Sequence, residues 1–116
     1  MNTQWHDFLA AVGAQFAADA RDISHFGNAA GELQAAASGT VLVPLTHLGL
    51  IDAAGEEAKS FLHNQLTSDI NHLAEGQAQH SAWCTAKGRM LASFVIWRRD
   101  GAYRLALAAE LEEAIL

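Results

Sequence analysis

Two long cations flank a glycine at Lys87-Gly88-Arg89, and this tripeptide is the best candidate in the sequence for ligand contact. Glycine permits a tight turn with a positive φ. Such a turn at the start of a strand presents both charges to solvent, where they could bind an anionic ligand such as a glutamate tail or a phosphate. A solvated hairpin without a ligand is the alternative. No Walker or dinucleotide glycine pattern is present, so a phosphate cradle is not supported.

Asp69 is a second candidate, because it follows Thr67 and Ser68 at the predicted end of a helix. Residues of these types bond nearby backbone amides, which favours a structural role over ligand orientation. Cys84 is the only cysteine and lies in the apolar run Ala82-Trp83-Cys84. A free cysteine in such a run is usually a small buried residue, and we expect neither a nucleophile nor a redox thiol.

The histidines suggest a metal site at first sight, but their spacing does not support one. His63, His72 and His80 are nine and eight positions apart. A helical zinc pair needs i, i+4 spacing, and finger-type sites need close pairs of cysteine or histidine. We therefore predict no metal site in this chain and no catalytic residue among these side chains.

The composition limits the classes of function. The chain has 116 residues, with 13 acidic and 7 basic side chains and a net charge of −6. Nucleic-acid binding needs Lys and Arg clustered on one face, so we expect no direct nucleic-acid contact. A single cysteine excludes an intramolecular disulfide, and residues 1–20 lack the basic and apolar regions of a signal peptide. No apolar run approaches the ~20 residues that cross a bilayer. We expect a soluble, cytoplasmic protein.

Apolar periodicity predicts an α+β domain. The expected helices and strands are helices over 4–21, 55–66 and 108–116, and strands over 41–43, 48–52, 78–85, 89–98 and 102–107. From residue 48 this order is close to a split β-α-β (ferredoxin-like) plan, which predicts a mainly antiparallel sheet with helices on one face, preceded by an N-terminal helix. Residues 1–40 form the N-terminal helix and connector, and residues 41–116 form the domain. Because the last helix stops on Ile115-Leu116 without a closing signal, we expect truncation at the C-terminus.

Two segments in register carry a family resemblance. Residues 61–69, F-L-H-N-Q-L-T-S-D, resemble the F-L-x-x-Q-x-T-x-D segment of YgfZ-type proteins, and residues 84–90, C-T-A-K-G-R-M, resemble their C-[DTS]-x-K-G-[RK]-[ML] turn. The match covers about residues 42–107. This family is related to the aminomethyltransferase T-protein of the glycine cleavage system.

The resemblance implies a tetrahydrofolate-binding protein that supports assembly or repair of iron–sulfur enzymes and, through them, tRNA modification. It makes Lys87, Gly88, Arg89, Asp69 and Leu48 the candidate cofactor-binding residues. Folate and iron–sulfur proteins or their assembly machinery are the implied partners. The family's K-G-C-[YF]-x-G-Q-E stretch, which holds its reactive cysteine, does not occur in residues 1–116.

Two departures from the family pattern bear on activity. Ala92 and Ser93 stand where the T-protein has an acidic pair, so a carboxylate for general-base help or charge stabilisation is missing. Leu48 stands where some relatives have a folate-contacting tryptophan. A leucine at this position keeps the apolar contact but lacks the aromatic face. The missing acidic pair argues against a classical aminomethyltransferase. A folate-dependent aminomethyl or one-carbon transferase stays one alternative function, and a protein-interaction module with a decayed folate site, which Leu48 suggests, is another.

Overall fold

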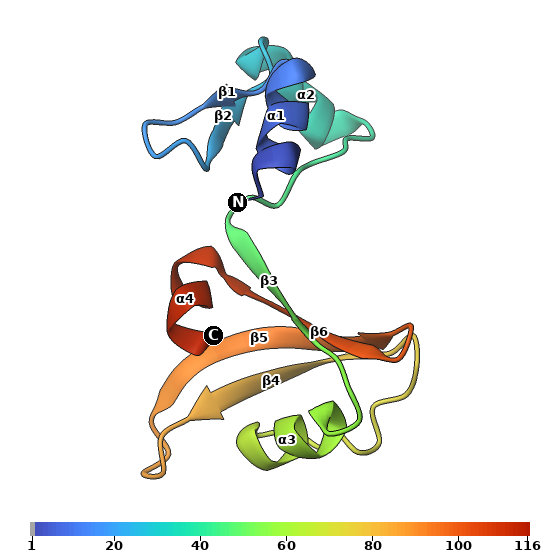
Figure 1. Ribbon diagram of the computed structural model, residues 1–116. Coiled ribbons are helices and arrows are strands. Elements are labelled where there is room, and N and C mark those ends of the chain that lie inside the picture. The colour runs from blue at the N-terminus through green and yellow to red at the C-terminus, as the bar shows by residue number, and fades with distance from the viewer. Residues whose placement is uncertain (1) are drawn as a thin grey trace. The chain divides into compact units, whose positions relative to one another are not determined.

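The chain divides into two compact units in the computed structural model, which describes residues 2–116 (Figure 1). Unit 1 is Met1–His47 and unit 2 is Leu48–Leu116. Within residues 2–116, no helix combines the length and the apolar character that crossing a membrane requires.

Unit 1 contains two helices and a short hairpin. The elements are α1 (Thr3–Ala11), β1 (Gln15–Phe16), β2 (Ile23–His25) and α2 (Ala29–Ser38). Asn2 begins α1, because its Oδ1 accepts hydrogen bonds from the backbone N–H of Gln4 and Trp5. Gly13 has φ +104°, a conformation that ends the helix. The expected N-terminal helix is therefore confirmed as the first element, but it is half the predicted length.

The connector holds more structure than the sequence suggested. Its glycines and serines predicted an irregular segment, yet β2 and all of α2 lie in it. Asn28 accepts a hydrogen bond from Gly31 N and thereby starts α2. Residues 41–43 form no strand, and Leu42 is 99% exposed. Propensity without a pairing partner does not make a strand, so that prediction was wrong.

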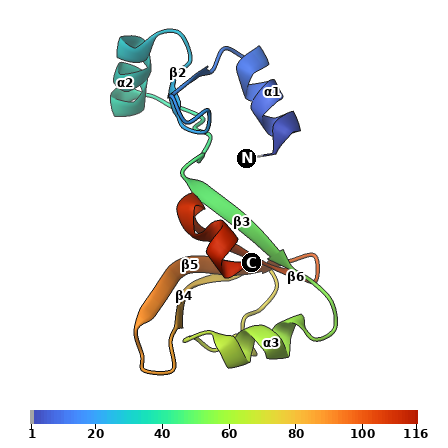
Figure 2. The ribbon, with the colours of Figure 1, turned by 60° about the vertical axis from the view of Figure 1, so that its left-hand side comes forward.

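Unit 2 is a four-stranded antiparallel sheet with helices (Figure 2). Its elements are β3 (Leu48–Ala53), α3 (Ala58–Gln65), β4 (Ala78–Cys84), β5 (Met90–Arg99), β6 (Ala102–Ala108), the 3₁₀ helix η1 (Ala109–Leu111) and α4 (Glu112–Ile115). The strand order is β3-β6-β5-β4, and every neighbouring pair is antiparallel.

The α+β class with an antiparallel sheet is confirmed, but the split β-α-β plan is not confirmed in detail. That plan puts one strand between the two strands that flank the helix. Here both β5 and β6 lie between β3 and β4, so β3 and β4 form the opposite edges of the sheet. The reason is that β4, β5 and β6 form a meander of consecutive hairpins, and β3 then pairs with the last of them.

One face of the sheet is covered. Alternate residues of β5 and β6 point to this face and are at most 5% exposed, namely Ala92, Phe94, Ile96, Tyr103, Leu105 and Leu107. Leu62 of α3 packs in the same cluster, and Leu111 and Ile115 pack against it. Gly49 on β3 leaves room for Glu112, because a Cβ there would lie 2.5 Å from Glu112 Oε2. The helices thus share one face, as predicted.

The opposite face is open. Leu50 of β3 is 60% exposed and Leu91 of β5 is 42% exposed, whereas Val95 and Trp97 are half-buried. Both faces of β5 are largely apolar in sequence, which is typical of a strand covered on both sides. In residues 2–116 only one side is covered, although β5 does occupy a central place in the sheet.

Candidate functional site

The turn between β4 and β5 is built around Thr85. Its backbone N–H donates to Arg89 O (2.8 Å), its carbonyl oxygen accepts from Gly88 N (2.9 Å), and its Oγ1 accepts from Arg89 N (3.1 Å). Gly88 has φ +84°, and a Cβ added to it would meet no atom within 4 Å, so the backbone conformation alone requires glycine. Three hydrogen bonds to one threonine therefore fix the geometry of the turn.

Lys87 and Arg89 project from this turn into solvent. Both residues are exposed, and neither has an ion-pair partner within residues 2–116. The other basic residues of the sheet differ: Arg98 pairs with Glu75, and Arg104 pairs with Asp52. The turn is thus a fixed backbone that carries two uncommitted positive charges.

Asp69 lies in the segment that follows α3, and its carboxylate is used within the fold. Oδ2 is 2.5 Å from His72 Nδ1, and Oδ1 is 3.5 Å from His63 Nδ1 and accepts from His72 N (3.3 Å). The side-chain hydrogen bond from His72 is the main cause that lowers the pKa of the Asp69 carboxyl below its ordinary value of 3.8. The carboxylate is therefore ionised at neutral pH, bound to His72 and close to His63.

The rest of this segment is tied to β4. Thr67 N donates to Ala82 O (3.0 Å), and Thr67 Oγ1 accepts from Ala82 N (3.1 Å). Ser68 Oγ donates to the buried Ser81 Oγ at 2.7 Å. Gln79 Nε2 donates to Ser68 Oγ (3.0 Å) and to Asp69 O (2.9 Å). The hydroxyls of this T-x-D segment therefore satisfy backbone and side-chain groups of the neighbouring strand.

The predicted ligand residues do not gather at one place. Leu48 is half-buried at the start of the edge strand β3, where it pairs with Ala108 of β6. Lys87, Gly88 and Arg89 lie in the turn that leads from the opposite edge strand, β4, into β5. Asp69 lies beside β4 with its own partners. The structure brings the three turn residues together and leaves Asp69 and Leu48 in separate surroundings.

Ala92 and Ser93 occupy consecutive positions on β5 and so face opposite sides of the sheet. Ala92 is 3% exposed on the covered face, and Ser93 is exposed on the open face, where it pairs with Ala82. Neither side chain carries a proton-accepting carboxylate. These two positions of β5 therefore supply neither a base nor a charge-stabilising group.

Cys84 is half-buried and free, and it pairs with Met90 at the irregular end of the β4–β5 ladder. No group of three or more His, Cys, Asp or Glu residues in the described part of the chain has the arrangement of a metal site. Asp69 Oδ2 is bound to His72 Nδ1, and His63 Nδ1 accepts a hydrogen bond from the Ile70 N–H.

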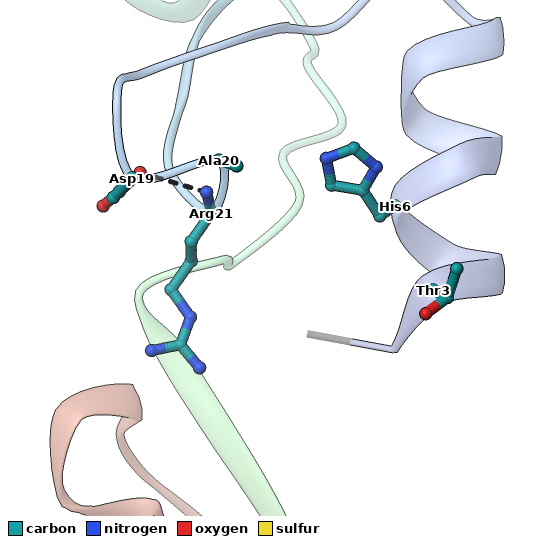
Figure 3. Close-up of a pocket in the computed structure, with 5 residues that line it drawn as sticks. All are labelled: Thr3, His6, Asp19, Ala20 and Arg21. Atoms are coloured by element: carbon teal, nitrogen blue, oxygen red, sulfur yellow. Dashed lines mark hydrogen bonds between the residues drawn. The ribbon is translucent and has the colours of Figure 1, made fainter.

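Unit 1 contains an open hollow of about 540 Å³ (Figure 3). It is lined by Thr3, His6, Asp19, Ala20 and Arg21. Asp19 Oδ1 accepts from the backbone N–H of Arg21 and Asp22, and these bonds lower the pKa of its carboxyl. His6 stacks on Phe16, with 4.1 Å between ring centroids. None of the lining residues is a predicted ligand residue.

The sequence did not reveal the residues that stabilise the β4–β5 turn and the segment after α3. Thr85 organises the Lys87-Gly88-Arg89 turn, and a threonine two residues before a basic-Gly pair is a signal for such side-chain bonding. His72 binds Asp69 and His63 lies beside it, but nothing in the spacing of these histidines indicates a common carboxylate. Gln79 is likewise found only when β4 is placed beside the segment.

Comparisons with known proteins give the family. The GCVT N-terminal domain family matches residues 4–114. The tRNA-modifying protein YgfZ of Colwellia psychrerythraea is 35% identical over 66 residues, which are 57% of this chain and 20% of that protein. An aminomethyltransferase of Lysinibacillus sphaericus is 34% identical over 74 residues, which are 62% of this chain and 20% of that protein. The chain thus spans about a fifth of the length of these relatives.

A solved structure supports the same assignment at the level of the fold. The glycine cleavage system aminomethyltransferase T from Bartonella henselae has a TM-score of 0.65 and 20% sequence identity, over 94% of this chain and 31% of that one. The family match extends over nearly the whole chain and includes both the segment after α3 and the β4–β5 turn. The chain belongs to the GCVT N-terminal domain family.

Proposed function

We propose that this chain is a tetrahydrofolate-binding module of a cytoplasmic accessory protein that supports iron–sulfur cluster assembly or repair and, indirectly, tRNA modification. Membership of the GCVT N-terminal domain family supports the folate part. Relatives named tRNA-modifying protein YgfZ support the accessory part. In this proposal residues 41–116 are the amino-terminal part of the folate-binding domain, and residues 1–40 precede it.

The pair of uncommitted cations at Lys87 and Arg89 carries the proposal. The chain has a net charge of −6, so its general field opposes an anionic ligand such as the glutamate tail of a folate. A local site must therefore supply positive charge that no carboxylate of the protein neutralises. Among the sheet's basic residues, Lys87 and Arg89 meet this requirement, and the bonds of Thr85 hold them on a fixed turn. Charge-assisted hydrogen bonds from such groups are about twice as strong as neutral ones.

Calorimetric titration of the chain with tetrahydrofolate tests this binding. We expect Lys87→Ala and Arg89→Ala each to weaken the affinity about tenfold, which corresponds to the loss of one charge-assisted bond. Arg99→Ala is the matched control, because Arg99 is also basic and exposed but lies at the opposite end of β5 and pairs with Asp100. Absence of binding at millimolar ligand, or equal losses in all three variants, would contradict the proposal.

The accessory role has a separate test in cells. Deletion of the gene should lower the activity of iron–sulfur enzymes, and the wild-type gene should restore it. A gene with both Lys87→Ala and Arg89→Ala should restore it poorly if folate binding is needed. Full restoration by this double variant would separate the cellular role from the ligand.

A second candidate is a folate-dependent aminomethyl or one-carbon transferase, which the relatives named aminomethyltransferase favour. Ala92 and Ser93 oppose it, since neither can accept a proton or carry negative charge at this part of β5. A direct assay of folate-dependent aminomethyl transfer distinguishes the two functions. We expect no turnover from the wild-type chain.

A third candidate is a protein-interaction module whose folate site has decayed. Leu48 favours it, because a half-buried leucine at the start of β3 offers no aromatic face for a pteridine ring. Substitution of Lys87 and Arg89 that left folate affinity unchanged but abolished a contact with another protein would select this function.

A further inference from the structure

The two histidines near Asp69 carry their ring protons on different nitrogens, because their hydrogen-bond partners differ. His63 Nδ1 lies 3.2 Å from the backbone nitrogen of Ile70, whose N–H donates to it, so Nδ1 is a hydrogen-bond acceptor. A ring nitrogen that accepts carries no proton, so neutral His63 has its proton on Nε2. His72 Nδ1 lies 2.5 Å from Asp69 Oδ2, and an ionised carboxylate only accepts, so His72 carries a proton on Nδ1.

We infer that protonation of His63 changes the hydrogen bonding of the strap, residues 66–77, which joins α3 to β4. We call this protonation-dependent contact the clasp. When His63 is neutral, its Nδ1 accepts the Ile70 N–H and holds the strap to the end of α3. When His63 gains a proton, Nδ1 can no longer accept, and it donates to Asp69 Oδ1 instead, which lies 3.5 Å away. One proton therefore exchanges a backbone partner for a carboxylate partner. This inference does not depend on folate binding.

The burial of the strap gives the exchange a structural consequence. Ile70 is fully buried and Leu73 is 3% exposed, and both belong to the core of unit 2. A buried backbone N–H that loses its acceptor is costly, because water does not replace the bond. Protonation of His63 therefore loosens the strap at the residue that anchors it.

The charged and titratable groups near His63 lie on the strap and on its own helix, α3. Asp69 and, beyond it, His72 face it from the strap, and Lys59 lies one helical turn before it on α3. On β4, the neutral amide of Gln79 donates to Asp69 O. His63 itself is in the last turn of α3. The lowered pKa of the Asp69 carboxyl keeps that group negative while imidazoles gain protons.

Nuclear magnetic resonance of the ¹⁵N-labelled chain tests the clasp. At pH 8 we expect the Nε2–H tautomer at His63 and the Nδ1–H form at His72. Between pH 8 and pH 5 the Ile70 amide signal should follow the titration of His63, and its exchange should rise about tenfold relative to the intrinsic rate, as loss of one hydrogen bond predicts. The amide of Leu105 in β6 serves as the internal reference.

Two variants separate the clasp from general destabilisation. His63→Gln keeps an acceptor that does not titrate, so the pH dependence at Ile70 should disappear. His80→Gln removes an exposed histidine of β4 and should leave it unchanged. An Nδ1–H tautomer at neutral His63, or an Ile70 amide that ignores its titration, overturns the inference. If His63→Gln does not fold, the tautomer in the unmodified chain decides the question.

Discussion

The segment after α3 and the turn between β4 and β5 both match the family motifs, but they differ in how much of their chemistry is already used. In the first, Thr67, Ser68 and Asp69 all bond to residues of β4, Asp69 through its backbone carbonyl, and Ile70 is fully buried. In the second, Lys87 and Arg89 are exposed, and only the backbone and Thr85 are engaged. A sequence motif can therefore identify a fold through residues that stabilise the fold, without offering side chains that are free to contact a ligand.

Truncation of one apolar residue in each segment is the strongest test of this difference. Ile70→Ala should lower the free energy of unfolding by about 2–5 kcal/mol, because it leaves a cavity in the core. Met90→Ala, at the end of the β4–β5 turn, should change it by less than about 0.5 kcal/mol, because Met90 is 60% exposed. Denaturant unfolding measures both values. Equal losses would show that the two segments do not differ as described.

Substitution of the turn glycine separates backbone geometry from ligand contact. Gly88→Ala should cost about 1–2 kcal/mol of unfolding free energy, because a Cβ is unfavourable at φ +84° although the surrounding space is open. Gly101→Ala in the β5–β6 turn is the matched control, with φ +75° and equally open space. Thermal denaturation should give similar losses for the two, whereas calorimetry should show weaker tetrahydrofolate binding in Gly88→Ala alone. A parallel fall in affinity for Gly101→Ala would mean that general stability controls binding.

Loss of one threonine hydroxyl in each segment gives a smaller, matched pair. Thr85→Val removes the acceptor of Arg89 N, and Thr67→Val removes the acceptor of Ala82 N, both at 3.1 Å. Each should cost about 0.5–1.5 kcal/mol in denaturant unfolding, since one hydrogen bond is lost. We expect the amide of Arg89 to exchange faster only in Thr85→Val. If neither variant differed from the wild type, these hydroxyls would not hold the segments.

The pH dependence of stability is the smallest expected effect. The folded-state pKa of Asp69 is lowered, chiefly by the hydrogen bond from His72, so the folded state favours the ionised carboxylate. The resulting stability is present above the unfolded-state pKa, near 3.8, and is lost as the pH falls through the lower folded-state value. Melting temperatures between pH 5 and pH 2 should therefore fall less steeply in Asp69→Asn. Asp100→Asn, in the turn after β5, should follow the wild type.

The sequence predicted the elements with strong periodicity and missed those that depend on distant partners. The helix over 55–66 and the three strands of the meander are close to α3, β4, β5 and β6, because apolar spacing and hairpin turns are local signals. The strand over 41–43 was wrong, since β-branched residues need a neighbouring strand. The order of the sheet also could not be derived locally, because β3 and β6 pair across most of unit 2.

The turn at Lys87-Gly88-Arg89 was the part of the candidate site that could be predicted from the sequence, because its geometry depends on neighbouring residues alone. Lys87-Gly88-Arg89 was expected in a tight turn, and Gly88 does have a positive φ. The engagement of Asp69 was not predictable, because His63 and His72 approach it only when the strap folds back on α3. The ligand role of Lys87, Gly88, Arg89, Asp69 and Leu48 remains a prediction that the titrations above address.

The topology of the sheet also bears on the order in which it assembles. Each pairing within the β4–β5–β6 meander joins neighbouring strands through a short turn, whereas β3 pairs residue 48 with residue 108. Closing the longer loop costs more chain entropy, so contacts of this kind form late. We expect β3 to dock last during folding and to detach first in partial opening. Amide exchange as slow in β3 as in β5 would contradict this order.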